Sequence, residues 1–317
     1  MLVLIILVIV PSVLTDNITR EENCELKKHC GAHFLEKPLR YARSLGGTRA
    51  KQNEFPWMAA FYVRKVKPTQ PFTFTTMACS GVQISKLHVL TAAHCVVENS
   101  PYLQMYCSQR IPVRNTDKYT VQDPVFFSMF IGSGCTNPDL CQRNRTNYSV
   151  AQVTVHEDYN PCNLSNDLAV IELDRKILPV HGSAICMTNP GELIRYPPYA
   201  VGFGIDPTDR PKRKEILSNL RFVKLAELGA GDPRLITAGD YTKSICKGDS
   251  GGPLTRKRNG KNYTLTGIAI ASDPLCDQPK TDVDTNSSGT GFTGIFTKNF
   301  PRRKLLPENS LRRPFST

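Results

Sequence analysis

The segment that most constrains this chain is residues 248–253, which read GDSGGP. Glycine adopts backbone conformations that other residues avoid, so three glycines around Ser250 predict a sharply turned loop. Glycines there also leave backbone N–H groups open to bind an oxyanion that develops during a reaction. A serine hydroxyl is a weak nucleophile until a neighbouring base takes its proton. A plain glycine-rich turn is the alternative interpretation, but six specified residues make a chance match improbable.

Two other segments offer the base and the acid that such a serine needs. Residues 91–95 read TAAHC and place His94 at the end of an apolar run, where it offers a base. Residues 166–170 read NDLAV, so Asp167 opens an apolar strand and can accept the second imidazole N–H of the base. Taken alone, His94 is more often structural and Asp167 more often a turn residue. Their chain order with Ser250 joins the three residues into one hypothesis.

On these motifs the chain resembles the trypsin and chymotrypsin family of serine proteases, from about residue 44 to residue 299. The order His, Asp, Ser is that of chymotrypsin and differs from the orders in subtilisin and the α/β-hydrolases. The resemblance implies an all-β fold of two six-stranded antiparallel β-barrels, with the active site in the cleft between them. Further matches in the family order are LGG at 45–47, FPW at 55–57, CSG at 79–81 and TGIFTK at 293–298.

The resemblance also implies a serine endopeptidase and gives each motif residue a role. Ser250 is the nucleophile, His94 is the general base and then the general acid, and Asp167 orients His94. The backbone N–H groups of Gly248 and Ser250 form the oxyanion hole, where each donor contributes about 3 kcal/mol to transition-state stabilisation.

The pattern of short β-rich runs between turn residues is typical of an all-β sandwich or barrel. Residues 96–147 interrupt this pattern, since they are irregular and hold three cysteines and two N-x-S/T sequons. We expect inserted loops there. The β-rich runs are 58–63, 74–84, 88–90, 150–155, 168–173, 200–203, 265–271 and 291–296.

The N-terminal segment 1–15 is an apolar run that ends in small residues. It is shorter than the about 20 residues of a membrane-spanning helix, so we expect a signal peptide, with a buried strand or helix as the alternative. A propeptide or linker is expected at 16–43, the protease domain at 44–299 and a basic tail at 300–317. Eleven cysteines and six sequons fit an oxidising compartment, and we expect a secreted protein without a membrane anchor. The sequons begin at Asn17, Asn144, Asn147, Asn163, Asn262 and Asn286.

The formal net charge is +12, but the basic clusters are not interleaved with aromatic residues as in nucleic-acid-binding segments. We therefore expect no nucleic-acid partner, while weak binding to polyanions stays open.

The six histidines and the acids show no metal-ligand spacing, so no metal or other cofactor is expected. The expected partners are protein or peptide substrates, an activating protease, and serpin-like or other protease inhibitors. A monomer is the default oligomeric state.

The resemblance implies synthesis as a zymogen. Cleavage of the Arg43–Ser44 bond would free an N-terminus that inserts and pairs with Asp249. The family starts with an apolar pair at this point, so Ser44 is a departure that forfeits about 2–3 kcal/mol of burial on insertion. The alternative interpretation is that Arg43 is only a linker residue.

Three disulfides follow from the resemblance. Cys79–Cys95 would clamp the loop of His94, and Cys246–Cys276 would brace the specificity pocket. Cys186 would tether the propeptide, with Cys30 as the expected partner ahead of Cys24. Cys135–Cys141 is a plausible local bridge, while the pairing of the other cysteines cannot be fixed from sequence, and the odd count leaves one unpaired or bonded to another chain.

The specificity pocket that the resemblance implies has Ser244 at its base and Ser272 and Gly294 in its walls. A neutral base and small walls predict an apolar or aromatic P1 residue, although Asp273 near the mouth offers an alternative attraction for a basic one.

Two departures lie beside this pocket, because Ile270 and Ala271 stand where the family carries serine and tryptophan. Together with Ser44 and a C-terminal segment without the family's helix pattern, they leave open a rival, a secreted protease homologue with little turnover that binds partners. A hydrolase that uses the same triad on small esters is a third reading.

Overall fold

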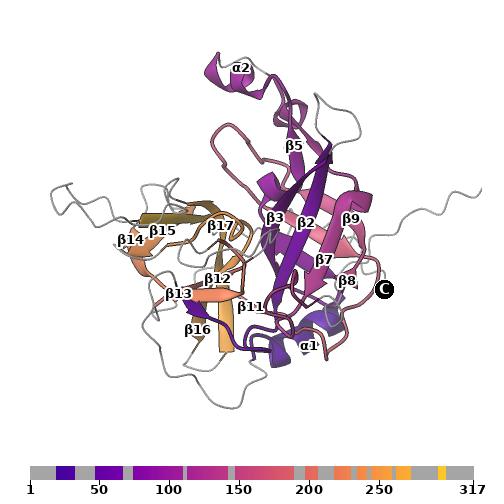
Figure 1. The fold of residues 1–317 in the computed structure, drawn as a ribbon, viewed down its shortest axis with the longest axis vertical. Coiled ribbons are helices and arrows are strands. Elements are labelled where there is room, and N and C mark those ends of the chain that lie inside the picture. The colour runs from indigo at the N-terminus through magenta and orange to yellow at the C-terminus, as the bar shows by residue number, and fades with distance from the viewer. Residues whose placement is uncertain are drawn as a thin grey trace, which may run out of the picture.

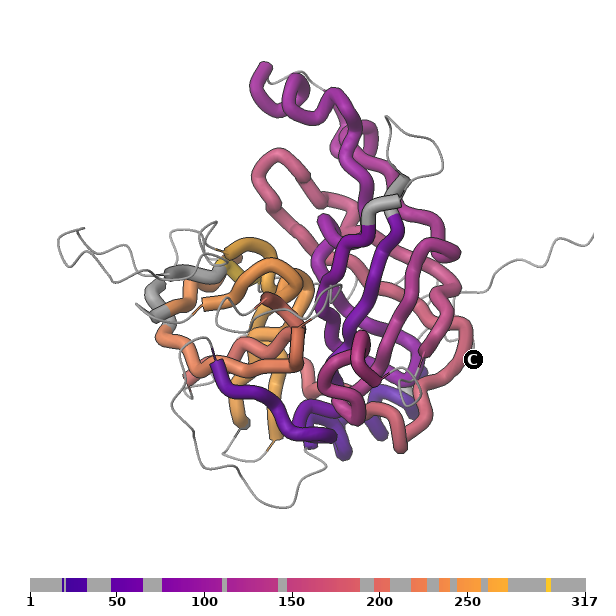
Figure 2. Tube along the Cα trace, in the orientation of Figure 1, coloured from indigo at the N-terminus to yellow at the C-terminus, as the bar shows by residue number. Residues whose placement is uncertain are grey.

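The structure is a computed structural model that describes residues 19–32, 47–66, 74–109, 113–141, 147–188, 197–205, 218–229, 234–240, 244–258, 262–272 and 292–297. Two β-sheets lie side by side and form the body of the molecule (Figure 1). Figure 2 follows the same trace and shows the first sheet in indigo to pink and most of the second in orange to yellow, with β1 of the second sheet in indigo. The expected signal peptide, the Arg43–Ser44 bond and the expected tail 300–317 lie outside the described residues. Among the residues that are described, no helix has the length and apolar character needed to cross a membrane.

The first sheet has the strand order β8-β7-β2-β3-β4-β10-β9 and is antiparallel throughout. Only Ser149 separates β8 from β9, while β8 pairs with β7 and β9 pairs with β10. One bent strand therefore joins the two edges of the sheet and closes it into a barrel. The strands are β2 Met58–Val66, β3 Phe74–Gln83, β4 His88–Thr91, β7 Phe127–Ile131, β8 Asn147–Tyr148, β9 Val150–Val155 and β10 Ala169–Leu173.

The second sheet closes in the same way. Its order is β1-β13-β12-β16-β17-β18-β15-β14, and only Leu225 separates β13 from β14, which pair with β12 and β15. Counted with each broken strand as one and without the two-residue strands β1 and β11, each sheet has six strands. The expected all-β fold of two barrels is confirmed. The strands are β1 Thr48–Arg49, β11 Cys186–Met187, β12 Tyr199–Gly202, β13 Arg221–Lys224, β14 Ala226–Gly229, β15 Leu235–Asp240, β16 Pro253–Arg258, β17 Asn262–Ser272 and β18 Phe292–Thr297.

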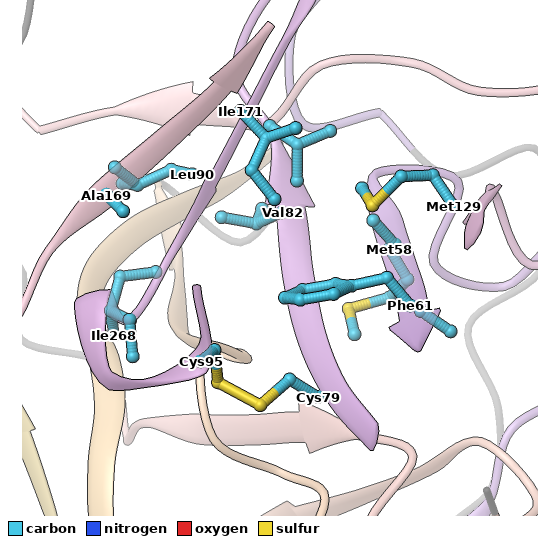
Figure 3. Packing of buried hydrophobic residues seen from close by; sticks show 14 of the residues in the cluster. Met58, Phe61, Cys79, Val82, Leu90, Cys95, Met129, Ala169, Ile171 and Ile268 are labelled. Atoms are coloured by element: carbon cyan, nitrogen blue, oxygen red, sulfur yellow. A yellow bond between two sulfur atoms is a disulfide. The ribbon is translucent and has the colours of Figure 1, made fainter. Parts of the chain in front are cut away.

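The larger core cluster fills the first barrel and reaches into the second. Strand β4 pairs with β3 and β10 and is buried at all four of its positions. Figure 3 shows Phe61, Leu90 and Ile171 converging from three strands beside the Cys79–Cys95 disulfide, with Ile268 of β17 close by. Each fully buried side chain of this size contributes about 1.5–3 kcal/mol relative to an exposed one. The core thus fixes the strands that carry the motif residues.

Residues 96–147 are more ordered than the sequence pattern predicts. Instead of loops alone, the segment contains β7, whose run FSMFI lies between β2 and β8 and packs into the first core. Before β7 comes an insert made of β5 Val97–Asn99, α2 Leu103–Ser108, the 3-10 turn Asn115–Lys118 and β6 Tyr119–Val121. A second 3-10 turn, Pro124–Phe126, leads into β7. Because the segment is rich in cysteines and sequons, the sequence analysis missed the core strand β7 within it.

The expected propeptide contains a helix, α1 Arg20–His29, where sequence analysis found only a polar stretch. Thr19 caps it by accepting a hydrogen bond from the Glu22 N–H, and acids in the first turn and bases in the last complement the helix dipole. Ten residues are marginal for a helix in isolation. The disulfide Cys30–Cys186 attaches the end of α1 to the body of the molecule.

Candidate active site

His94 lies in a one-turn 3-10 helix, Ala93–Cys95, that follows β4 directly. Strands β4 and β10 are antiparallel, with Thr91 opposite Ala169, so the same register carried two residues further places Asp167 opposite Ala93. The imidazole Nδ1 of His94 lies 2.7 Å from Asp167 Oδ2, and the His94 backbone N–H donates to Oδ1 at 2.8 Å. Strand register therefore brings the base and the acid together.

The Asp167 side chain is fully buried, whereas that of His94 is 25% exposed. Two hydrogen bonds from one residue compensate the buried carboxylate and fix the orientation of the imidazole ring. An Nδ1–H donated to Asp167 leaves Nε2 as the proton acceptor. Burial raises the pKa of the Tyr159 hydroxyl, and the nearby charge of Asp167 adds to this, so the tyrosine stays neutral. The arrangement suits a general base.

The Ser250 loop is fastened to the first barrel through Ser80. The Ser80 N–H donates to the Ser250 carbonyl at 2.9 Å, and its hydroxyl donates to the Gly248 carbonyl at 2.8 Å. Gly251 has a φ of 80°, and a Cβ on it would clash with Thr91 Oγ1 and the Ser80 carbonyl oxygen. Cys95 Sγ lies 3.7 Å from the Ser250 carbonyl oxygen. The loop thus lies beside the turn of His94.

Several polar groups of the Ser250 loop make no hydrogen bond within the described part of the chain. Across the described residues, the backbone N–H groups of Gly248 and Ser250 and the hydroxyl of Ser250 make no hydrogen bond. Their neighbours are bonded, since Asp249 N–H donates to Cys246 and Gly251 N–H donates to Ala269. Two unused backbone donors, one residue apart and one of them on the serine itself, form the kind of site that binds an oxyanion.

The Asp249 carboxylate is held by two backbone N–H groups. Its Oδ1 accepts the Gly204 N–H at 2.8 Å and its Oδ2 accepts the Cys246 N–H at 2.9 Å. A Cβ at Gly202 or Gly204 would collide with this carboxyl group, so both glycines make room for it. The N-terminal partner expected from cleavage after Arg43 lies outside the described residues.

The three predicted pocket residues come from two neighbouring strands and one loop. Ser272 ends β17 and pairs with Gly294 of β18, so the two wall positions are cross-strand neighbours. The Ser244 hydroxyl is buried, and within the described part of the chain it has no hydrogen-bond partner. Ile270 is 5% exposed and belongs to the larger core cluster. Such a buried, unpaired hydroxyl favours a ligand that supplies a polar or polarisable atom.

Four disulfides join described cysteines. Cys79–Cys95 holds the turn of His94, and Cys30–Cys186 holds the end of α1, beside which Gly31 bonds to Ala184 and Tyr263 through the backbone. Cys135–Cys141 closes a short loop. Cys107–Cys162 was not predicted, and no local signal in the sequence pairs residues so far apart.

Of the remaining cysteines, Cys246 is also disulfide-bonded, but its expected partner Cys276 lies outside the described residues. Cys24 is free and exposed on α1. Among described residues, Cys79, His94 and Cys95 bring potential metal-ligand atoms within 4.8 Å of one another. The two sulfurs are bonded to each other, so they offer no thiolate to a metal.

Comparisons with known proteins agree with this geometry. The trypsin family model matches residues 44–290. CLIP domain-containing serine protease B4 of Anopheles gambiae is 26% identical over 286 residues, 85% of this chain and 69% of that protein. Chymotrypsin-C of Bos taurus is 27% identical over 252 residues, 75% and 81% of the two chains. Phenoloxidase-activating factor 3 of Holotrichia diomphalia is 29% identical over 273 residues, 80% and 68% of the two chains. The chain belongs to the trypsin family and is a serine endopeptidase.

Proposed function

We propose that this endopeptidase hydrolyses peptide bonds through an acyl-enzyme formed on Ser250, with His94 and Asp167 completing the catalytic triad. The observation that carries the proposal is the double hydrogen bond from His94 to the buried Asp167, opposite a serine whose hydroxyl and flanking N–H groups are unused in the described part of the chain.

In the first half of the reaction, His94 Nε2 removes the proton from Ser250 Oγ as the oxygen attacks the carbonyl carbon of the substrate. The N–H groups of Gly248 and Ser250 bind the resulting oxyanion. The imidazolium then gives its proton to the leaving amine, and an acyl-Ser250 ester remains. Water attacks this ester in the same way, with His94 again taking and returning the proton. Asp167 keeps Nε2 facing the serine throughout.

The unbonded state of Ser250 Oγ is compatible with this mechanism, because catalytic hydrogen bonds are often long before substrate binds. Active-site titration of purified protein with a slow acylating ester tests it. A burst of one product equivalent per Ser250 is expected, and a burst that persists in Ser250→Ala would contradict the assignment.

We infer an apolar or aromatic P1 preference from the neutral Ser244 and the small residues Ser272 and Gly294. The unpaired Ser244 hydroxyl supports a pocket that also accepts a polar group on an aromatic ring. Profiling with peptides that differ only at P1 tests this, and a clear preference for Lys or Arg would contradict it.

We also propose that the protein is secreted as a zymogen, with a signal peptide at 1–15, a propeptide at 16–43, a protease domain at 44–299 and a basic tail at 300–317. The start of the family match at residue 44 supports cleavage of the Arg43–Ser44 bond, and the disulfides support an oxidising compartment. The name phenoloxidase-activating factor of one relative supports a protein substrate. N-terminal sequencing after limited trypsin treatment tests the cleavage point, with Ser44 expected first.

The rival function, partner binding with little turnover, rests on Ser44, Ile270, Ala271 and the altered C-terminal segment. Of these, Ile270 stands in place of a serine that would hold the acid. Against it, Asp167 already receives two hydrogen bonds from His94, so its position does not depend on residue 270. The expected turnover therefore survives this departure.

A further inference from the structure

The insert that follows His94 makes a projection at the end of the molecule opposite α1 (Figure 1). Its two short strands β5 and β6 pair with each other, and α2 lies between them in sequence. β5 begins at Val97, three residues after His94, so the base of the projection is continuous with the turn of the proposed general base. A movement of the projection would therefore displace the turn that carries His94.

A disulfide links this projection to the segment of the proposed triad acid. Cys107 in α2 bonds to Cys162, in the loop 156–166 that leads directly to Asp167. The projection is thus attached at one end to the turn of His94 and, through the disulfide, to the loop that precedes Asp167. The Cys107–Cys162 bond closes this path between the two segments.

The loop 156–166 has a backbone that requires support. Leu164 and Asn166 have φ values of 56° and 53°, in the left-handed region that a leucine avoids. Turns inside the loop hold part of it, since the Asn160 and Asn163 side chains accept hydrogen bonds from the N–H groups of Cys162 and Ser165. Asn166, the last of these residues, immediately precedes Asp167, so a relaxed loop would move the carboxylate.

A second contact joins the projection to the same loop near its start. Tyr119, the first residue of β6, packs its ring 5.2 Å from the ring of Tyr159, which is 1% exposed. Tyr159 N–H donates to His156, and His156 N–H donates to Leu168, the residue after Asp167. The ring contact therefore supports Tyr159 in the loop before Asp167, and through the hydrogen bonds of His156 it also supports Leu168 after it.

We propose that the insert is a positioning device for the triad: through Cys107–Cys162 and the Tyr119–Tyr159 contact it holds the loop 156–166 so that Asp167 stays against His94. This inference rests on the proposed function, because it gives a role to residues outside a triad that is itself proposed. The positioning residues act through Asp167 and do not touch substrate.

The experiment compares two double variants of the full chain that each lose one disulfide and gain no unpaired cysteine. Cys107→Ser with Cys162→Ser releases the insert from the loop, whereas Cys135→Ser with Cys141→Ser opens a local loop and serves as the matched control. Rates are measured with a peptide ester and divided by the active-site titre, so misfolded molecules do not count. We expect kcat of the first variant to fall about 10- to 100-fold with KM within about twofold, because small misplacements of catalytic groups have effects of this size. The control should keep the wild-type kcat.

A second pair of variants leaves every disulfide in place. Tyr119→Ala should lower kcat about 3- to 10-fold, and Tyr119→Phe, which keeps the ring against Tyr159, should restore it. This pair decides the matter if the first double variant does not fold.

Three results would overturn the positioning role. Unchanged kcat in both Cys107→Ser/Cys162→Ser and Tyr119→Ala would show that the insert does not act on Asp167. A raised KM with unchanged kcat would make the insert part of the substrate site, and an equal loss in the Cys135→Ser/Cys141→Ser control would make the effect one of general stability. If the wild-type chain shows no turnover that depends on Ser250, the proposed function fails first and the inference fails with it.

Discussion

The two halves of the proposed active site differ in how their polar groups are satisfied. On the first barrel, the Asp167 carboxylate takes both N–H groups that His94 offers it, and the pair is complete without substrate. On the second barrel, Ser250, Gly248 and Ser244 keep hydrogen-bonding groups unused among the described residues. A buried polar group without a partner costs about 1–3 kcal/mol, so the buried Ser244 hydroxyl in particular is expected to gain its partner from a ligand.

In the proposed mechanism, this difference gives each barrel a different task. The first barrel provides a base whose orientation is fixed in advance, which removes reorganisation from the chemical step. The second provides donors that gain their partners as the oxyanion forms, which is the kind of interaction that raises kcat. Changes on the first barrel should therefore affect both stability and rate, whereas changes to the unused groups of the second should affect rate or specificity alone.

The largest effect is expected from Ser250→Ala. Removal of the nucleophile should lower kcat about 10⁶-fold, by analogy with other triads. Because the Ser250 hydroxyl makes no hydrogen bond within the described residues, the free energy of unfolding should change by less than about 0.5 kcal/mol. Peptide-ester kinetics and urea unfolding check the two expectations. A large loss of stability would break the comparison, and unchanged cleavage would remove Ser250 from the mechanism.

Asp167→Asn comes next and should differ in kind. The amide favours the wrong imidazole tautomer, so kcat should fall about 10⁴-fold. One hydrogen bond from His94 also loses its acceptor, which should lower the free energy of unfolding by about 1–3 kcal/mol. Asp174→Asn, the same change at an exposed residue just after β10, is the control and should leave both quantities unchanged. An Asp167 variant with wild-type stability would show that the first half is not as tightly satisfied as described.

Gly251→Ala tests the contact between the Ser250 loop and strands β3 and β4 of the first barrel. Its φ of 80° and the close approach of Thr91 and Ser80 leave no room for a Cβ, so the free energy of unfolding should fall by about 2–4 kcal/mol. Gly134→Ala is the matched control, because a Cβ there meets only Asn53 Oδ1, at 3.2 Å. Thermal unfolding of the two variants gives the difference, and equal shifts would argue against the packing of the Ser250 loop on β3 and β4.

The smallest effect on overall catalysis is expected from Ser244→Asp. A carboxylate at the proposed pocket base should shift the P1 preference toward Lys and Arg by about tenfold to a hundredfold in relative kcat/KM. The active-site titre should not change, since Ser244 makes no hydrogen bond in the described part of the chain. Profiling with matched peptides checks the shift, and an unaltered profile would mean that other residues form the pocket.

The sequence alone predicted the parts of this molecule that depend on local motifs. His94, Asp167 and Ser250 stand in short segments whose residue types specify a turn, a strand start and a glycine loop. Strand register then brings the first two together, and Ser80 fastens the third beside them. The β-rich runs likewise predicted an all-β sandwich or barrel, because alternation along a strand is a local property, while the choice of two barrels came from the family resemblance.

One disulfide and two secondary-structure elements were not predicted from the sequence. Cys107 and Cys162 are 55 residues apart, and pairing at that distance depends on how the insert folds. Strand β7 was missed because its apolar run lies among cysteines and sequons, although the run FSMFI by itself is a signal for a buried strand. Helix α1 was missed because its sequence is polar, although the cap at Thr19, the acids of the first turn and the bases of the last turn were local signals for it.

The central claim is that Ser250 is an activated nucleophile, and covalent labelling tests it most directly. The full chain, before and after limited trypsin treatment, is reacted with a fluorophosphonate and the labelled peptide is identified by mass spectrometry. We predict an adduct on Ser250 that increases after cleavage at Arg43 and is absent in Ser250→Ala. A cleaved, folded protein that takes no label, or takes it equally in Ser250→Ala, would contradict the account.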